Sequence, residues 1–183
     1  FAMAGGYATV SLTQALDVPF LLALALAFLL VGGASILFER LLYARLYRAS
    51  ELDQVLLSIG LVFMAAAAFT FAYGPSPQRV DVPGYLNGQI DLGLRAFATY
   101  RVFLIAVGLG LMVALWLLFE RTLIGARIRA AVDNRRMAQS VGINTSLLFT
   151  LTFALGSGLA ALGGGLGAEI IAIQPTYPFE HLV

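Results

Sequence analysis

Long apolar runs alternate with short charged or turn-rich segments along the chain. An α-helix needs about 20 mostly apolar residues to cross a hydrocarbon core of about 30 Å. Four runs reach or approach that length, at residues 18–38, 54–73, 102–119 and 146–173. Residues 1–16 look like part of a further membrane segment. The pattern predicts an all-α, polytopic membrane protein with at least four transmembrane helices plus a partial N-terminal one.

The composition supports a membrane protein. Of the 183 residues, 60% are hydrophobic and 11% are charged, and the mean hydropathy is +0.90. Such a chain cannot cover a soluble domain of this size with polar surface. We expect a single transmembrane domain over residues 1–183. The opening "FAMAGGYATV" and the ending "PFEHLV" look like cuts, so the chain is expected to be an internal fragment.

Arginine placement predicts the orientation of the chain. All eleven basic residues are arginines, and short cytoplasmic loops are the ones that collect them. Eight of the eleven lie in residues 39–53 and 120–145; they are Arg40, Arg45, Arg48, Arg121, Arg127, Arg129, Arg135 and Arg136. We therefore expect both loops to be cytoplasmic and residues 74–101 to form the outer loop.

The outer loop has a pattern of its own. "RVDV" at 79–82 and "QIDLGL" at 89–94 each alternate apolar and polar residues, and the turn formers "PGYLNG" lie between them. This pattern fits a short hairpin between these two segments, and it fits an irregular loop on the membrane surface equally well.

The charged stretch "RAAVDNRRMAQSVGIN" at 129–144 interrupts the apolar chain. On a helix, its small and apolar residues share one face; they are Ala130, Ala131, Met137, Ala138 and Val141. Asp133 can then pair with Arg129 and Arg136, and Gly142 ends the helix. The apolar face suits a protein partner, whereas the arginines would also suit a helix resting on lipid headgroups.

A resemblance favours the protein partner. "GARIRAAVDNRRMAQSVGINTSLLFTLTFALGSGLAALGGGL" resembles the signature region of permease subunits of branched-chain amino acid ABC transporters, a group that also serves related amides and urea. The segments "FAMAGGYATV", "ERLLYARLYR" and "SIGL" agree with the same family. Members of that family are longer, with a helix before this start and further helices after this end.

The resemblance implies that residues 129–144 form a coupling helix that docks on a separate ATPase subunit. It implies packing contacts from Met137, Ala138 and Val141, and short ties at 123–127 and 142–145. The remaining residues expected in this site are polar or cap the helix; they are Arg129, Asp133, Arg135, Arg136, Gly142 and Asn144. No phosphate-binding G-x-x-x-x-G-K-[ST] motif occurs, so ATP and Mg²⁺ are expected on the ATPase and no cofactor on this chain.

Further partners follow from the same resemblance. They are a second permease subunit, identical or related, and a periplasmic solute-binding protein, with the chain embedded in the lipid bilayer of a bacterial inner membrane. A net charge of +1 gives no basic surface for nucleic acid. The absence of cysteine and the single histidine, His181, give no metal site.

The last predicted span is rich in glycine; its glycines are Gly156, Gly158, Gly163, Gly164, Gly165 and Gly167. Gly163 and Gly167 form a small-xxx-small pair that would let another helix approach closely. The run suits either a span that rearranges during transport or close static packing. Glu169 is the one carboxylate in the predicted spans, and it either meets a solute's amino group or reaches outer water.

Two functions compete. The first is a permease subunit of an ATP-driven importer of branched-chain amino acids or related small polar solutes. The second is a self-contained channel or facilitator for a small neutral solute, which would need no cytoplasmic partner. An enzyme is not expected, because the spans offer no paired carboxylates, no histidine cluster and no nucleophile beside a base.

Overall fold

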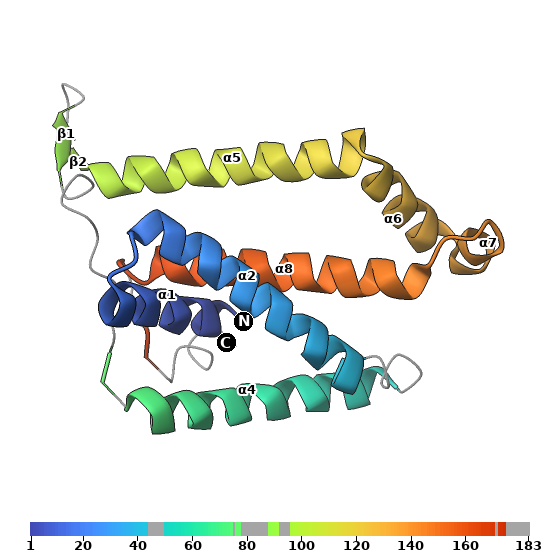
Figure 1. Ribbon diagram of the computed structural model, residues 1–183, viewed down its shortest axis with the longest axis horizontal. Coiled ribbons are helices and arrows are strands. Elements are labelled where there is room, and N and C mark those ends of the chain that lie inside the picture. The colour runs from blue at the N-terminus through green and yellow to red at the C-terminus, as the bar shows by residue number, and fades with distance from the viewer. Residues whose placement is uncertain (44–49, 75, 78–87, 92–95, 171, 175–183) are drawn as a thin grey trace. The chain divides into compact units, whose positions relative to one another are not determined.

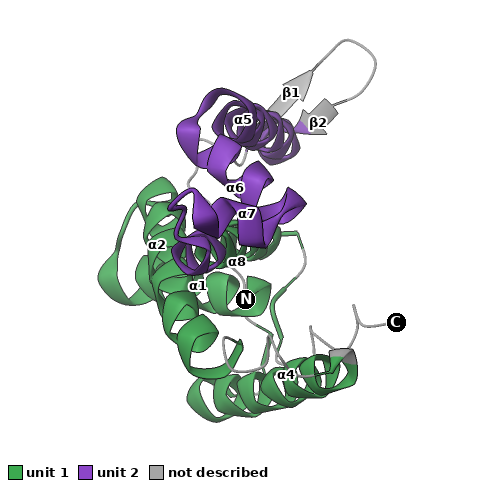
Figure 2. Ribbon diagram, turned by 90° about the vertical axis from the view of Figure 1, so that its right-hand side faces the viewer, with its two compact units in different colours: residues 1–81, 152–183 green, residues 82–151 purple. Residues whose placement is uncertain are grey.

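Figure 1 shows the computed structural model, which describes residues 1–43, 50–74, 76–77, 88–91, 96–170 and 172–174. The chain divides into two compact units, coloured in Figure 2. Unit 1 contains residues 1–81 and 152–183, and unit 2 contains residues 82–151. Four of the described helices are long and apolar enough to cross a membrane, which confirms the predicted fold class. The sides on which the loops lie stay a prediction.

Unit 1 begins with two helices, α1 (Ala2–Leu16) and α2 (Phe20–Phe38). Asp17 ends α1 in a left-handed conformation at φ 49°, and its backbone N–H donates to the carbonyl of Leu12. Pro19 follows, and a proline disfavours helical angles in the residue before it. The chain therefore turns at 17–19, and α1 and α2 contact each other.

The part of α8 (Thr145–Gly167) that belongs to unit 1 packs against α1 and α2 through glycines. A Cβ on Gly5 of α1 would overlap the backbone of Ala161, and a Cβ on Gly164 would overlap the backbone of Ala2. On α2, a Cβ on Gly32 would lie 3.1 Å from the carbonyl oxygen of Ala154. Small residues thus bring the three backbones together, as they do between membrane helices.

The interior of unit 1 is mostly apolar, and two of its buried hydroxyls, those of Thr9 and Ser35, bond to backbone carbonyls. Phe20 and several alanines of α2 are buried. The buried hydroxyl of Thr9 donates to the carbonyl of Gly5 at 2.8 Å, and that of Ser35 donates to the carbonyl of Gly32 at 2.7 Å. Because a hydrocarbon environment supplies no water, such hydroxyls need a partner within the protein.

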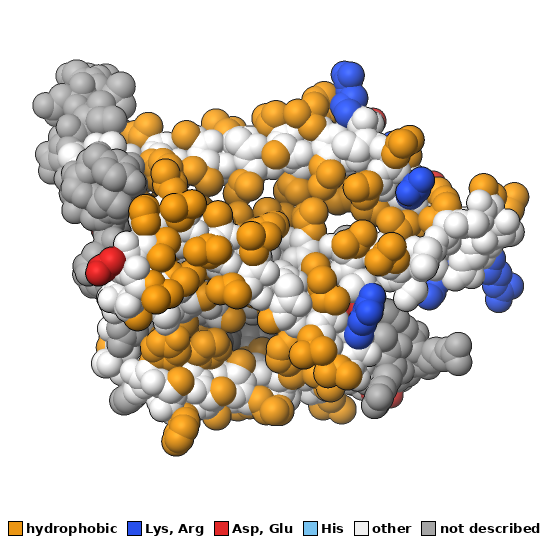
Figure 3. All heavy atoms as spheres, viewed as in Figure 1, with side chains coloured by type: hydrophobic (Ala, Val, Ile, Leu, Met, Phe, Trp, Pro, Cys, Tyr) orange, Lys and Arg blue, Asp and Glu red, His pale blue; other side chains and the backbone are white. Residues whose placement is uncertain are grey.

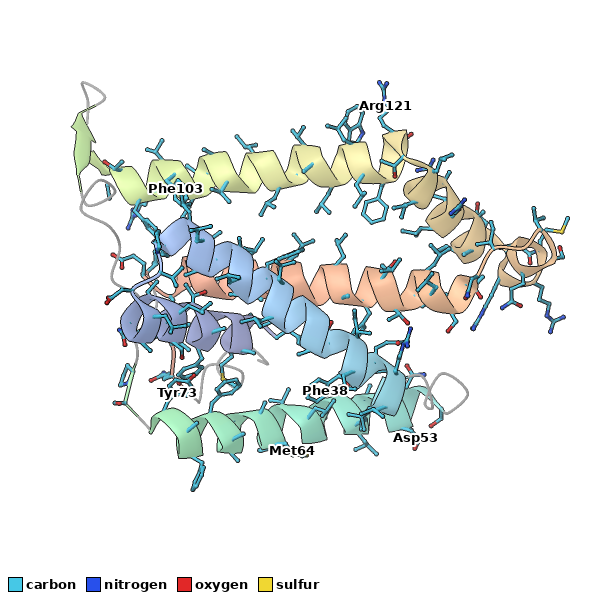
Figure 4. The ribbon with its side chains drawn as sticks, in the orientation of Figure 1. Phe38, Asp53, Met64, Tyr73, Phe103 and Arg121 are labelled. Carbon is cyan, nitrogen blue, oxygen red and sulfur yellow. The ribbon has the colours of Figure 1, made fainter. Side chains whose placement is uncertain are left out.

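Helix α4 (Glu51–Tyr73) begins with a capping box, in which the Ser50 hydroxyl accepts from the backbone of Asp53 and the Asp53 carboxylate accepts from the backbone of Ser50. Its C-terminal end contacts α1 through aromatic rings (Figure 4). Tyr7 lies 4.7 Å from the ring of Tyr73, and the Tyr73 hydroxyl is 2.6 Å from that of Ser11.

A π-helical turn, η1 (Glu39–Tyr43), continues α2. Glu39 in this turn is only 2% exposed. Tyr43 at its end lies 5.2 Å from the ring of Phe153 on α8. The end of α2 is therefore anchored to α8 by an aromatic contact.

Unit 2 opens with a two-stranded antiparallel hairpin, β1 (Gln89–Asp91) and β2 (Ala96–Ala98), with Gln89 opposite Ala98. The predicted hairpin paired 79–82 with 89–94, and the structure corrects this pairing. Residues 89–91 pair with the strand that follows them, which needs a shorter loop. Residues 79–82 lie outside the described part of the chain.

Helix α5 (Thr99–Arg121) follows the hairpin. At its C-terminal end the guanidinium of Arg121 lies over the ring of Trp116, 5.7 Å from its centre, and Figure 4 shows Arg121 projecting from this end. A cation in this position is attracted to the face of the indole ring. It also interacts favourably with the negative end of the helix dipole.

The long helices leave much apolar surface uncovered. Figure 3 shows hydrophobic side chains spread over the face in view. The exposed apolar residues of the long helices include Met64 of α4 and Met112 of α5. Phe71 of α4 is 95% exposed. Apolar surface of this extent is typical of helices that face lipid or other membrane helices.

Helix α8 ends earlier than predicted. The apolar run predicted a span over 146–173, but the helix ends at Gly167 and a turn follows over residues 168–170. Ile173 is buried after the turn, and its side chain occupies the space next to Gly6 of α1. Ile173 therefore packs against α1 beyond the end of the helix and does not extend it.

Candidate functional site

Residues 122–145, which we call the helical connector, join α5 to α8. The connector contains α6 (Leu123–Asp133) and α7 (Arg135–Ser140). Thr122 starts α6, because its hydroxyl accepts from the backbone N–H of Gly125 at 3.2 Å. Residues 123–127, predicted as a short tie, are instead the first turns of α6.

The single helix predicted over 129–144 is wrong, since the structure breaks it at Asn134. This residue is extended, with φ −150° and ψ 95°, and its side chain accepts from the backbone N–H of Met137 at 3.0 Å. Asparagine competes with a helix in this way by bonding to nearby backbone. The break lets α7 leave the axis of α6.

Gly142 ends the second helix as predicted. Its φ of 86° suits glycine, and its N–H donates to the carbonyl of Gln139 at 3.0 Å. The N–H of Ile143 donates to the carbonyl of Ala138 at 3.0 Å. These two bonds form the Schellman arrangement that closes helix C-termini.

Asn144 and Thr145 start α8 directly after that turn. The Asn144 side chain accepts from the backbone N–H of Leu147 at 3.0 Å. The buried Thr145 hydroxyl accepts from the side-chain amide of Gln139 at 2.8 Å, which ties α8 to α7. The observed role of Asn144 is therefore to cap α8.

A small apolar cluster holds the connector against the start of α8. Ala131 of α6, Ala138 of α7 and Leu148 of α8 are buried in it, and Ile128 and Ile143 pack on its edge. Ala138 was predicted to contact an ATPase. The structure corrects this assignment, because Ala138 lies inside the cluster and is only 4% exposed.

The other two apolar residues predicted to contact a partner are at the surface. Met137 is 64% exposed and Val141 is 74% exposed. Met137 lies in α7 and Val141 is its C-cap, four residues further on, while Ala138 between them is buried in the cluster. We call Met137 and Val141 the α7 face.

The charged residues of the connector are arranged differently from the prediction. Asp133 was expected to pair with Arg129 and Arg136, but in the described part of the chain it pairs with neither. Arg129 instead forms an ion pair with Glu120 at 3.5 Å. Arg135 lies over the ring of Phe149 on α8, 5.2 Å from its centre, and Arg136 is exposed.

The glycines of α8 fall into two groups. A Cβ on Gly158 would lie 2.7 Å from the ring of Phe28, and one on Gly165 would lie 2.6 Å from the Thr9 hydroxyl. A Cβ on Gly164 would overlap Ala2, whereas a Cβ on Gly156, Gly163 or Gly167 would meet nothing within 4 Å. The predicted pair Gly163 and Gly167 therefore makes no packing contact in the described part of the chain.

Glu169 is not inside a helix. It lies in the turn after Gly167 and is half-buried. The prediction that it sits within a span is therefore wrong, because the span ends before it. His181 lies outside the described residues.

Three residues that shape this site were not predicted: Thr122, Gly125 and Asn134. The signal was present, since a threonine three residues before a glycine, and an asparagine three residues before Met137, each have the spacing of a helix N-cap. The apolar periodicity of 129–144 concealed the boundary at Asn134.

Within the described residues, no group of three or more histidine, aspartate or glutamate side chains could hold a metal ion.

The features above define a polytopic membrane protein whose apolar helices are joined by a basic helical connector with a small exposed apolar face.

The sequence assigns the family. Residues 1–180 match the family described as branched-chain amino acid transport system / permease component, and the chain belongs to it. It is a family of ABC permease subunits, which are not catalytic and bind no cofactor themselves. With its four candidate spans, the chain is a multi-pass protein of the bacterial inner membrane.

Individual relatives are distant. The chain is 25% identical over 144 residues to the high-affinity branched-chain amino acid transport system permease protein LivH of Escherichia coli (strain K12), covering 76% of this chain and 46% of LivH. It is 24% identical over 163 residues to the corresponding protein BraD of Pseudomonas aeruginosa, covering 87% of this chain and 53% of BraD. The chain thus spans about half the length of these relatives. No solved structure matches it.

Proposed function

We propose that this chain belongs to the permease subunit of an ATP-driven importer of branched-chain amino acids or related small polar solutes, such as amides and urea. The helical connector is the part that docks on a separate ATPase subunit. The observation that carries the proposal is the α7 face, where Met137 and Val141 are exposed while Ala131 and Ala138 are buried behind them.

An exposed apolar face in this position suits a protein partner. Arg135 and Arg136 directly precede it in the chain, and the cost of placing arginine in hydrocarbon keeps the connector at or outside the membrane boundary. A methionine and a valine that project into water there gain from burial in a complementary groove. Methionine adapts its shape to such a groove.

The cluster behind the α7 face supports a mechanical role. Ala138 and Ile143 are held against Leu148, and Gln139 is bonded to Thr145. A displacement of α7 by a bound ATPase is thereby passed to the first turn of α8. The remaining exposed polar contacts in this proposal are Arg135, Arg136 and Asp133.

The orientation and the other partners complete the proposal. Residues 39–53 and 120–145 face the cytoplasm, and 74–101 face outward, where a periplasmic solute-binding protein delivers the solute. A second permease subunit, identical or related, completes the pathway. The open space beside Gly163 and Gly167 is where another membrane helix could approach α8 closely.

The names of the relatives, which specify branched-chain amino acid transport, support this solute class. A self-contained channel for a neutral solute is the alternative function. In that case the connector rests on lipid headgroups through its arginines and the α7 face has no protein partner.

Cross-linking tests the docking surface. This chain has no cysteine, and with any cysteine elsewhere in the full-length permease replaced by serine, Val141→Cys provides a single reactive thiol. We expect a thiol-directed cross-linker to join it to the cognate ATPase subunit. Leu16→Cys is the control, since Leu16 is 67% exposed but lies at the predicted outer side. If the thiol at 141 reacts with a maleimide yet yields no cross-link to the ATPase, the proposed surface is wrong.

A further inference from the structure

The junction between α5 and α6 is unusually close, and we call residues 119–129 the elbow. A Cβ on Gly125 would overlap the carbonyl group of Phe119 in the last turn of α5. The obstructing atoms belong to the backbone, so no side chain can rotate away to make room. Only glycine fits at position 125 with this angle between the helices.

The Thr122 hydroxyl makes one hydrogen bond to α5 and one to α6. Its hydroxyl donates to the carbonyl of Leu118 in α5 at 2.5 Å and accepts from the N–H of Gly125 in α6 at 3.2 Å. Its own backbone is extended, at φ −110° and ψ 156°. One residue therefore ends α5 and starts α6 without an intervening loop.

Arg129 of α6 contacts the C-terminal end of α5. Its guanidinium donates to the carbonyl of Phe119 and forms the ion pair with Glu120. The carbonyls at a helix C-terminus have no partner in the helix and carry its negative dipole, so a cation there is favourable. The ion pair alone is exposed and adds little, which leaves the bond to the Phe119 carbonyl as the main contact.

We propose that Gly125 and Arg129 are positioning residues that fix the angle between α5 and α6, so that α6 moves as a rigid extension of α5. Arg129 was predicted to belong to the residues that couple the chain to the ATPase, and the elbow gives it a different role. The consequence for transport rests on the function proposed above: motion imposed on the connector by an ATPase reaches α5 without loss at a flexible joint.

Distance measurements between two spin labels test the rigidity directly. Cysteines introduced at Met112 on α5 and Val132 on α6, both exposed, carry the labels in the full-length permease. We expect one narrow distance distribution for the native elbow, and a shifted and broader one for Gly125→Ala. Gly108→Ala is the matched control, because a Cβ on Gly108 of α5 meets nothing within 4 Å.

Arg129 variants keep the test decisive if Gly125→Ala does not fold. Arg129→Gln is expected to broaden the distribution, and Arg129→Lys to do so less, because it keeps the charge but not the forked guanidinium. Glu120→Gln should change little. Native distributions in both Gly125→Ala and Arg129→Gln, or in Arg129→Gln alone where the glycine variant does not fold, would overturn the proposal.

A second readout separates this inference from the proposed function. The elbow variants are expected to retain capture of the ATPase subunit but to lose the stimulation of ATP hydrolysis by solute and binding protein. Unchanged stimulation in variants with a broadened elbow would contradict the mechanical role. If the native permease captures no ATPase, the proposed function fails, while the spin-label distances still decide whether the elbow is rigid.

Discussion

Replacing Met137 and Val141 together with aspartate is expected to abolish capture of the cognate ATPase subunit by the full-length permease. The two side chains are the exposed apolar residues of the α7 face, and a carboxylate buried in an apolar groove is strongly unfavourable. Hot-spot substitutions at interfaces cost about 2 kcal/mol or more each. Two of them would weaken binding by roughly a thousandfold if their effects add, which a detergent pull-down detects as complete loss.

The control for this experiment is Leu52→Asp. Leu52 lies in the first turn of α4 and is 74% exposed, like Val141, but it is not part of the connector. Aspartate is well tolerated in the first turn of a helix. Equal capture by the native chain and by the Met137→Asp, Val141→Asp double variant, with both correctly folded, would rule out the α7 face as the docking surface.

A single methyl group added at Gly164 is expected to destabilise unit 1. A Cβ there overlaps the backbone of Ala2, so α1 and α8 must move apart. Overpacking of this kind costs about 1–3 kcal/mol. We expect Gly164→Ala in the purified full-length permease to lower the midpoint of thermal unfolding, measured by the loss of helical circular dichroism.

Gly156 of the same helix provides the control. A Cβ on Gly156 meets nothing within 4 Å, so Gly156→Ala should leave the midpoint unchanged or raise it, since alanine is the better helix former by about 1 kcal/mol. The same midpoint in both variants would mean that α1 and α8 do not pack as described.

Much of the fold could be predicted from the sequence because hydrocarbon imposes a strong constraint. Every span needs a long uncharged helix, and the runs at 18–38, 54–73 and 102–119 correspond to α2, α4 and α5. The glycine at 142 could be predicted to end α7 because few other residues accept a positive φ.

The connector could be predicted only in part, because local and tertiary effects oppose its periodicity. The pattern of 129–144 fits one helix, yet the side chain of Asn134 bonds to the backbone and divides it in two. The spacing of Ala138, Met137 and Val141 predicts that the three residues share one helix face. Ala138 instead packs against Leu148, because its side chain is small. Spacing alone does not distinguish a face turned to a partner from one turned to the chain itself.

The glycines of α8 show the same limit. A small-xxx-small pair indicates that a close approach is sterically allowed, and it does not say which neighbour uses it. Gly163 and Gly167 have that spacing and open surroundings, whereas Gly158 and Gly165 meet α1 and α2. The direction in which a glycine faces depends on where the other helices pack, and that arrangement has no local signal in the sequence.

Solute uptake by proteoliposomes tests the central claim most directly. Full-length permease is reconstituted with and without its ATPase subunits, and entry of labelled leucine is followed with the solute-binding protein outside and ATP inside. We predict accumulation above the external concentration only when the ATPase and hydrolysable ATP are both present. Equilibration of the solute in vesicles that contain the permease alone would contradict the importer assignment and identify a channel.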